Sequence, residues 1–237
     1  MTKLKILEVG CGKGRNAEVL KKHWKADVVG IDLSPEIIAT AERLHPSVEF
    51  QVMSLESLDF PNQNFDRIYG LDVLEHVDDL AKSADEIVRV LKPKGVLVVN
   101  VPAEKSEHWL LKIRPSYFEE MHHVRIFKAG EMEKLFSERG LLLAKHKRKG
   151  FIDHLLLFYL FRRINPSSSQ LGIGRWSDSR LGTILFALQT YTKPEFVFST
   201  WLWLFPVWIV LIPLGFLINT VGNRFFPKSM YYEFIKH

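Results

Sequence analysis

Glu8-Val-Gly10-Cys-Gly12-Lys-Gly14 is the stretch that indicates the fold, and it begins within the apolar run Lys5–Val9. An apolar run that ends at clustered glycines is typical of a buried parallel strand whose backbone then turns sharply into a helix. The N-terminus of such a helix lies close to whatever ligand the turn accommodates. Asp32 ends the next apolar run, 22 residues after Gly10. A carboxylate at that place can accept hydrogen bonds from both hydroxyls of a ribose, so the spacing predicts a nucleoside-binding unit.

Glu8 narrows the class of ligand. The pattern Gly12-x-Gly14-x-x-Ala17 also satisfies the looser fingerprint of dinucleotide-binding turns, so the glycines alone do not decide. A carboxylate two residues before Gly10 can meet a cationic ligand group, whereas it repels a pyrophosphate. The sequence therefore favours a positively charged nucleoside over a dinucleotide.

Strand and helix signals alternate through the first 150 residues. Further strands are predicted over residues 27–31, 48–52, 65–70, 95–101 and 141–145, and helices over 16–24, 73–91 and 129–139, with another helix start at Ser34-Pro35-Glu36. Such alternation predicts an α/β fold with a mostly parallel sheet and right-handed crossovers.

Composition limits the class of protein. The chain has 237 residues, a formal net charge of +5 and a hydrophobic fraction of 47%, which excludes a largely disordered chain. Because 25% of the residues are charged, a bundle of apolar helices alone is excluded as well. A single cysteine, Cys11, excludes a disulfide scaffold and a multi-cysteine metal site, and no other metal-ligand set is predicted. No apolar signal segment precedes Gly14, so we expect the chain to start in the cytosol.

The sequence resembles class I S-adenosylmethionine-dependent methyltransferases, of the kind found in quinone and other small-molecule biosynthesis. The matching segments are Ile6–Gly12, Val29–Ser34, Phe65-Asp66, Asp72–Val77, Leu91–Val96 and the substrate-side segment His123–Phe127, which occur in the family's order over about residues 1–150. The resemblance implies a Rossmann-like, mostly parallel seven-stranded sheet with helices on both faces. It also implies that the aromatic run Ser229–Ile235 forms a last, antiparallel strand beside the sixth.

The resemblance also implies which residues contact the cofactor, S-adenosylmethionine. They lie where the first four strands end: Gly10, Cys11, Gly12 and Gly14 under the methionine and ribose, Glu8 near the amine, Asp32 at the ribose hydroxyls, Leu33 on the adenine, Ser54 and Leu55 at the adenine edge, and Leu71 and Asp72 at the methionine end. Many relatives carry Asp at the position of Ser54, so a backbone carbonyl or a water is an alternative partner for the adenine amino group. Cys11 is also a small residue that a glycine turn tolerates.

Two histidines are candidates for catalysis. Methyl transfer from a sulfonium depends mainly on positioning and desolvation, and a base is needed only when the nucleophile is a hydroxyl. His123 lies in the substrate-side segment, and His76 lies in the segment after strand four. For His76 the alternative is an ordinary helix-start residue, and for His123 it is a residue without direct substrate contact.

The C-terminal part differs from an ordinary soluble domain. Phe196–Asn223 has no charged residue over 28 positions, whereas basic residues stand on both sides, and Pro206 and Pro213 would interrupt a membrane-spanning helix. We therefore expect three parts: a methyltransferase domain over 1–150, an apolar and basic helical insertion over 151–227, and the final strand over 228–237. An apolar, basic segment favours an anionic membrane surface over nucleic acid.

Three functions remain open from the sequence. The first is methyl transfer to a lipid-soluble or lipid-linked acceptor by a protein held peripherally, monotopically or re-entrantly at the cytoplasmic face of a membrane. The second is a soluble small-molecule methyltransferase whose insertion forms a substrate lid or the interface of a homo-oligomer. The third is a non-catalytic membrane-binding module with the same fold.

Overall fold

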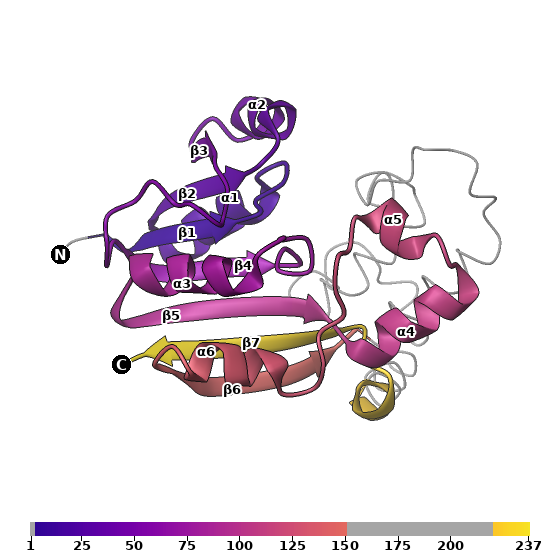
Figure 1. The fold of residues 1–237 in the computed structure, drawn as a ribbon. Helices are drawn as coiled ribbons and strands as arrows, with labels where there is room; N and C mark the ends of the chain where they lie inside the picture. Colours follow the sequence, from indigo (N-terminus) through magenta and orange to yellow (C-terminus); the bar gives the residue numbers. More distant parts are fainter. Residues whose placement is uncertain (1–2, 151–219) are drawn as a thin grey trace, which may run out of the picture. The chain divides into compact units, whose positions relative to one another are not determined.

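A seven-stranded sheet forms the centre of the protein (Figure 1). The computed structural model describes residues 3–150 and 220–237. The strands are β1 (Lys5–Val9), β2 (Asp27–Asp32), β3 (Glu49–Val52), β4 (Phe65–Leu71), β5 (Leu91–Pro102), β6 (Leu141–Lys149) and β7 (Ser229–Lys236), in the order β3-β2-β1-β4-β5-β7-β6. The first five are parallel, and β7 lies antiparallel between β5 and β6. The predicted fold class and the last strand's pairing are both confirmed.

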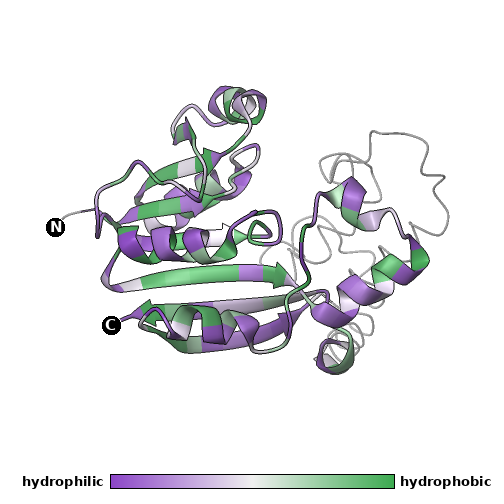
Figure 2. Cartoon of the chain, in the orientation of Figure 1, coloured by the Kyte–Doolittle hydropathy of each residue, from purple (hydrophilic) through white to green (hydrophobic). Residues whose placement is uncertain are grey.

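Helices cover both faces of this sheet, as expected. They are α1 (Arg15–Trp24), α2 (Pro35–Leu44), α3 (Leu80–Val90), α4 (Glu104–Ile113), α5 (Tyr117–Met121) and α6 (Glu131–Ser137). Alternate residues of one strand enter two cores: Leu7 packs with α3 and α6, whereas Ile6 packs with α1 and α2. Apolar residues accordingly run along the central strands, as Figure 2 shows for β5. Burial on both faces explains why these strands are continuously apolar.

The order of the strands places the site. The chain moves outward from β1 through β2 to β3, then returns to the other side of β1 with β4 and β5. Where the direction reverses, the loops that follow β1 and β4 diverge at the carboxyl ends of the strands, and ligands bind there in open α/β sheets. Helices α4 and α5 lie beyond the carboxyl ends of these strands (Figure 1).

One predicted helix is wrong in its first third. We expected a helix over residues 73–91, but α3 begins at Leu80, and residues 73–79 form turns instead. Asp72 has a positive φ of 54°, which breaks the chain's path after β4. Asp79 accepts a 2.9 Å hydrogen bond from the backbone N–H of Lys82 and so caps α3. Helices α4 and α5 were not predicted at all.

Several strand boundaries also differ from the prediction. Strand β5 begins at Leu91 rather than Gly95, with a register shift against β4 between Phe65 and Arg67. Strand β6 extends to Lys149 because it pairs with β7 along nearly its whole length. The helix expected over 129–139 is α6, which is shorter at both ends.

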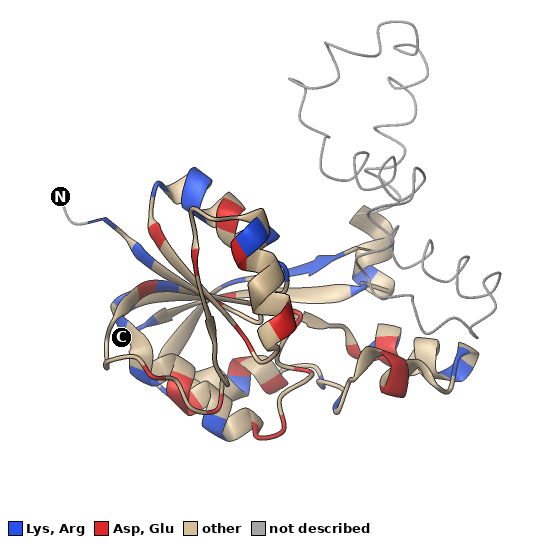
Figure 3. Cartoon of the chain, turned by 90° about the horizontal axis from the view of Figure 1, so that it is seen from above, with Lys and Arg blue, Asp and Glu red and all other residues tan. Residues whose placement is uncertain are grey.

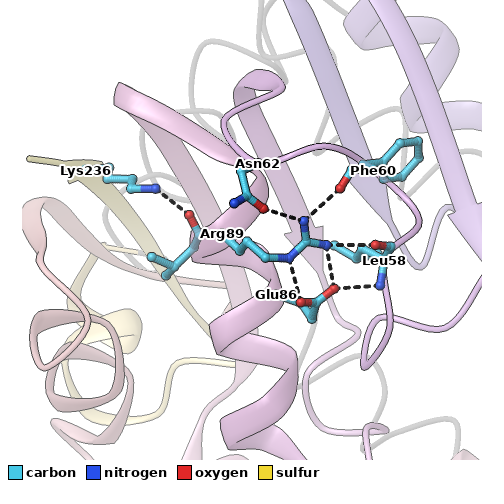
Figure 4. A network of polar contacts seen from close by, with 7 residues as sticks. Leu58, Phe60, Asn62, Glu86, Arg89 and Lys236 are labelled. Atoms are coloured by element: carbon cyan, nitrogen blue, oxygen red, sulfur yellow. Dashed lines mark hydrogen bonds and ion pairs between the residues drawn. The ribbon is translucent and has the colours of Figure 1, made fainter.

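A network around Arg89 fixes the loop between β3 and β4 to α3 (Figure 4). The guanidinium donates to both carboxylate oxygens of Glu86 and to the carbonyls of Leu58 and Phe60, at 2.7–2.8 Å. It also donates to the side-chain oxygen of Asn62 at 2.8 Å. One cation thus satisfies acceptors from the whole loop. Lys236 similarly ties β7 to the end of α3 through the carbonyls of Val88 and Leu91, at 2.6 and 2.7 Å.

The chain divides into two compact units, Met1–Lys149 with Phe226–His237, and Gly150–Phe225. All strands and helices named above belong to the first unit. Most of the predicted insertion lies outside the described residues, so the domain boundaries stay predictions. No helix within the described ranges is long and apolar enough to cross a bilayer.

Candidate active site at the carboxyl ends of the parallel strands

The glycine turn after β1 has the backbone conformation that its sequence requires. Gly10, Gly12 and Gly14 have φ of 66°, 53° and 81°, in the left-handed region that side chains disfavour. A Cβ at Gly10 would stand 2.5 Å from the Cγ2 of Val73. The turn after β1 therefore packs directly against the turn after β4, which brings two halves of a site together.

Asp32 stands at the end of β2 beside this turn. Its Oδ2 accepts a 3.0 Å hydrogen bond from the backbone N–H of Gly12, and its Oδ1 accepts one of 3.2 Å from that of Ser34. These bonds fix the carboxylate's orientation while the residue keeps part of its surface in solvent. Leu33, the next residue, is 71% exposed, which is unusual for leucine and suits contact with a flat apolar ring.

Glu8 lies under the glycine turn rather than beside it. The residue is 2% exposed, and its Oε2 has no hydrogen-bond partner among the described residues. Burial raises the pKa of Glu8 to about 8, although hydrogen bonds from the Asn16 side chain and the Ala17 backbone act in the opposite direction. The same carboxyl is a cause, after burial, of the raised pKa of Cys11, which is about 12. A thiol with so high a pKa stays protonated at neutral pH, and only the thiolate is a good nucleophile.

The remaining predicted cofactor residues occupy the adjoining turns. Ser54 accepts a 3.2 Å bond from the backbone N–H of Glu56 through its Oγ, so the hydroxyl is already engaged locally. Leu55 is 6% exposed and belongs to the core. Leu71 is half-buried, and Asp72 is exposed after β4, where its Oδ1 accepts a 2.7 Å bond from the Asn100 side chain.

The two predicted catalytic histidines lie together, although 47 positions separate them. The rings of His76 and His123 are in edge-to-face contact, with centroids 5.0 Å apart. The backbone N–H of Val124 donates to the carbonyl of Glu75 at 3.0 Å, and Arg125 donates to the carbonyls of Val77 and Asp78. The substrate-side segment is thereby tied to the turn after β4.

His123 is buried and held by a carboxylate that the sequence analysis missed. Its Nδ1 lies 2.7 Å from Oε2 of Glu107 on α4, and both side chains are less than 5% exposed. Tyr117 donates a 3.2 Å bond to the other oxygen of Glu107. Burial, followed by the charge of Glu107, raises the pKa of the Tyr117 phenol, which stays protonated as a donor.

Glu75 is the second carboxylate that the analysis missed. It is 1% exposed, and its Oε2 has no hydrogen-bond partner in the described structure. Burial, then the nearby charge of Asp72, raises the pKa of Glu75 well above its usual range. Burial also lowers the pKa of His76. One oxygen of Glu75 and one nitrogen each of His76 and His123 lie within 4.8 Å of one another.

Only one of these carboxylates had a signal in the sequence. Glu75 stands in the segment Asp72–Val77 that resembles the family, directly before His76. Glu107 lies on a helix that was not predicted, so nothing in the pattern indicated that it would meet His123. Local spacing cannot show a contact that forms only when α4 folds beside the turn after β4.

The residues at this edge of the sheet fit S-adenosylmethionine. The buried Oε2 of Glu8 has no hydrogen-bond partner among the described residues and suits a cationic ligand group. No atom lies within 4 Å of the position that a Cβ of Gly12 would take, so a ligand can approach the backbone there. The oriented carboxylate of Asp32 and the exposed Leu33 suit a ribose and an adenine. The assignment of each residue to a part of the cofactor stays a prediction.

Comparisons with known proteins match part of the chain to methyltransferases. Residues 7–99 match the family described as "Methyltransferase domain". The chain is 37% identical over 97 residues to the 2-methyl-6-phytyl-1,4-hydroquinone methyltransferase of Synechocystis, which covers 40% of this chain and 30% of that protein. It is 36% identical over 101 residues to the ubiquinone biosynthesis O-methyltransferase of a Bradyrhizobium species, covering 41% of this chain and 39% of that one. The demethylmenaquinone methyltransferase of Chlorobaculum parvum is 34% identical over 114 residues, which cover 48% of this chain and 47% of its own length. The chain therefore spans less than half the length of these relatives.

Solved structures share the fold. Phosphoethanolamine N-methyltransferase 2 of Haemonchus contortus, in complex with S-adenosyl-L-methionine, matches with a TM-score of 0.61 at 17% identity, over 99% of this chain and 49% of that chain. The [4+2]-cyclase SpnF matches with a TM-score of 0.58 at 18% identity, over 99% of this chain and 75% of that chain. Because one of these proteins is named a cyclase, the fold alone does not identify the reaction.

Proposed function

We propose that this protein transfers a methyl group from S-adenosylmethionine to a lipid-soluble or lipid-linked acceptor at the cytoplasmic face of a membrane, because residues 7–99 match the family described as "Methyltransferase domain". The observation that carries the proposal is the contact between Gly10 and Val73. It joins the glycine turn and Asp32 on one side to Glu75, His76 and His123 on the other. A nucleoside-binding half and a half with ionisable side chains thus lie at one edge of the sheet.

The first half of the site binds and orients the methyl donor. S-adenosylmethionine supplies a methyl group that its sulfonium already activates. Asp32, held by two backbone N–H groups, accepts hydrogen bonds from the ribose hydroxyls without having to reorganise. Glu8 balances the positive charge of the ligand's amine. Displacement then depends on holding acceptor and methyl carbon in line, out of water.

The second half binds the acceptor. The buried Glu107 carboxylate contacts the Nδ1 of His123 and so fixes the orientation of the ring. The other ring nitrogen, Nε2, therefore has a fixed direction and is free to contact the acceptor. Such a histidine orients a hydroxyl and promotes the loss of its proton. We therefore propose a hydroxyl nucleophile, and the names of the relatives support a hydroquinone-type or other quinone-related acceptor.

The membrane part of the proposal depends on the sheet edge that precedes the apolar segment. Strand β6 is the edge strand, and all of it after Leu141 is exposed. Its second half carries Lys145, Lys147, Arg148 and Lys149, and Figure 3 colours the ribbon blue at Lys and Arg positions. The apolar run 151–161 follows directly in the sequence. Clustered cations next to apolar residues favour anionic lipid headgroups, by about 1 kcal/mol per Lys or Arg near the surface.

A transfer assay tests the activity. Protein is incubated with methyl-labelled S-adenosylmethionine and a membrane lipid extract, and labelled products are identified by mass. We expect a labelled lipid-soluble product with the natural protein and much less of it with Asp32→Ala at the same donor concentration. His123→Ala is expected to lower turnover by about 10²–10⁴-fold while leaving S-adenosylhomocysteine binding intact. Label that appears only in water-soluble products would favour a soluble small-molecule methyltransferase.

Vesicle binding tests the location separately. We expect the full chain to sediment with vesicles containing anionic lipid, to resist a high-salt wash because much of the attachment is apolar, and to be released by detergent. A variant with Lys145, Lys147, Arg148 and Lys149 changed to Gln is expected to bind those vesicles more weakly. A protein that stays in the supernatant with every vesicle would refute the membrane part of the proposal and leave the activity standing.

A further inference from the structure

Glu75, His76 and His123 form a cluster whose shape goes beyond the binding of an acceptor. The first two follow β4, and the third follows α5, so the cluster exists only because the two segments are hydrogen-bonded together. A carboxylate oxygen and one nitrogen from each ring lie within 4.8 Å of one another. Small rotations of these side chains would bring three such donor atoms around a single ion.

Hydrogen bonds set the same tautomer in both histidines. The Nδ1 of His76 lies 2.9 Å from the carbonyl oxygen of His122, which can only accept, so this nitrogen carries the proton. The Nδ1 of His123 lies 2.7 Å from the Glu107 carboxylate and donates in the same way. With this tautomer, a neutral ring keeps its lone pair on Nε2. Histidine ligands of metals have this arrangement, with the other nitrogen bonded to a carbonyl or a carboxylate.

Glu75 adds an independent observation. Its carboxyl group is 99% buried, and its Oε2 has no hydrogen-bond partner in the described part of the chain. Asp72 and Glu107 are close enough to disfavour its charge further. No Lys or Arg among the described residues forms an ion pair with Asp72, Glu75 or Glu107. A buried, unpartnered acid among other acids is costly unless a cation balances it.

We propose that Glu75, His76 and His123 bind one divalent transition-metal ion, such as Zn²⁺, with Glu107 orienting His123 from behind. Two imidazoles and one carboxylate suit zinc and its neighbours in the first transition series, whereas Mg²⁺ and Ca²⁺ prefer sites made of oxygen atoms. Three protein ligands leave a coordination position open for another oxygen, as catalytic zinc sites do. The sequence analysis predicted no metal ligands, because these three residues have no recognisable metal-binding spacing.

The role of the ion rests on the proposed function. A hydroxyl of the acceptor occupies the open position, where the cation lowers its pKa and the proton passes to water. The hydroxyl oxygen then bonds to the methyl carbon as the carbon–sulfur bond of the donor breaks, and the bonding pair stays on sulfur. The products are a methyl ether, a neutral thioether and one proton. In this arrangement His123 promotes the loss of the hydroxyl proton through the cation that it binds, rather than by contacting the hydroxyl itself.

Metal binding is measured on the full chain after treatment with a chelator. Zn²⁺ is titrated by calorimetry, and Co²⁺ by its visible absorption, with Mg²⁺ as a comparison. We expect one equivalent of Zn²⁺ or Co²⁺ per chain and a Co²⁺ spectrum of low coordination number. Glu75→Gln and His76→Ala should each weaken binding by more than tenfold, and Glu107→Gln, which removes only the outer carboxylate, by about 10–100-fold.

His122→Asn is the matched control. His122 is an exposed neighbouring histidine with a left-handed φ of 55°, which Asn tolerates, and only its backbone carbonyl contacts His76. This variant should bind the ion like the natural protein. Equal Zn²⁺ affinity in Glu75→Gln, His76→Ala and the control, or no stoichiometric binding by the natural protein, would overturn the proposal. S-adenosylhomocysteine binding is measured on the same metal-free samples. If the natural protein does not bind this ligand, the proposed function is refuted but the metal site is not. A variant that binds the ligand like the natural protein is folded.

Discussion

Glu8→Gln is the substitution whose effect on stability follows most directly from the structure. Glu8 is 2% exposed under the glycine turn, and burial raises its pKa from 4.5 to about 8. The folded protein therefore holds a proton on Glu8 at neutral pH that the unfolded chain has already lost. Glutamine has nearly the same shape as the protonated acid and does not titrate, so this substitution removes the linkage while preserving the packing.

The sign and size of the effect follow from proton linkage. The stability that protonated Glu8 contributes is fully present below pH 4.5 and is lost as the pH rises through about 8. Between pH 5.5 and pH 7.5 the free energy of unfolding should fall by roughly 2–3 kcal/mol on this account, near the limit of about 1.4 kcal/mol per pH unit for one proton. All other groups titrate alike in both proteins, so the difference between them isolates Glu8.

Urea unfolding at the two pH values, in the absence of ligand, measures this difference. We expect the stability of Glu8→Gln relative to the natural protein to rise by roughly 2–3 kcal/mol between pH 5.5 and pH 7.5, because the two proteins match only below about pH 4.5. Parallel pH dependence in the two proteins would refute the reasoning, because Glu8 would then be ionised in the folded state. A second readout is the proton balance of S-adenosylhomocysteine binding. If the ligand's amine lies near Glu8, binding at pH 7 should release a proton that the variant does not release.

Three further substitutions test the site and its support. Asp32→Ala should weaken S-adenosylhomocysteine binding in calorimetry by about 1.5–3 kcal/mol, because it removes hydrogen bonds between a carboxylate and the ribose hydroxyls. Gly10→Ala should lower the free energy of unfolding by about 1–3 kcal/mol beyond the cost of a left-handed φ, because its Cβ would meet Val73 at 2.5 Å. Arg89→Met should destabilise the protein in urea by about 2–3 kcal/mol, because it leaves the acceptors of the loop before β4 without their shared donor.

Each has a control elsewhere in the chain. Asp27→Ala changes an exposed acid at the start of the same strand as Asp32 and should leave ligand affinity unchanged. Gly130→Ala also has a left-handed φ, of 82°, with no atom within 4 Å of the added Cβ, so it carries the backbone cost alone. Arg43→Met removes an exposed cation from α2. If any test variant behaves like its control, the contact assigned to it does not matter energetically.

Local sequence determined most of the sheet and the cofactor side of the site. Apolar runs of five or six residues, over 5–9, 27–31 and 65–70, predicted parallel strands, because burial on both faces leaves little room for polar residues. The cap at Ser34 was also predicted, and its Oγ accepts from the backbone N–H of Ile37 at 3.2 Å. These features depend on neighbours in the chain, so the sequence displays them directly.

The turn after β4 could not be predicted in the same way. Its residues have the apolar spacing of a helix, and we expected one from residue 73. The turn persists instead because Asp79 caps the later helix and because the carbonyl of Glu75 is satisfied by Val124, from a distant segment. A backbone group that finds its partner outside the local chain gives no periodic signal.

The acceptor side of the site is a product of tertiary structure alone. The sequence contains Glu75, His76, Glu107 and His123 as scattered residues, and only two of them were candidates. Folding α4 and α5 over the carboxyl ends of the strands brings the rings of His76 and His123 to 5.0 Å and places Glu107 at 2.7 Å from His123. Those contacts bury Glu75, Glu107 and His123 and set the tautomers of the two histidines. They also leave the Oε2 of Glu75 without a hydrogen-bond partner among the described residues. The physical reason is that the environment of a titratable side chain is set by what packs around it, and most of those atoms come from other parts of the chain.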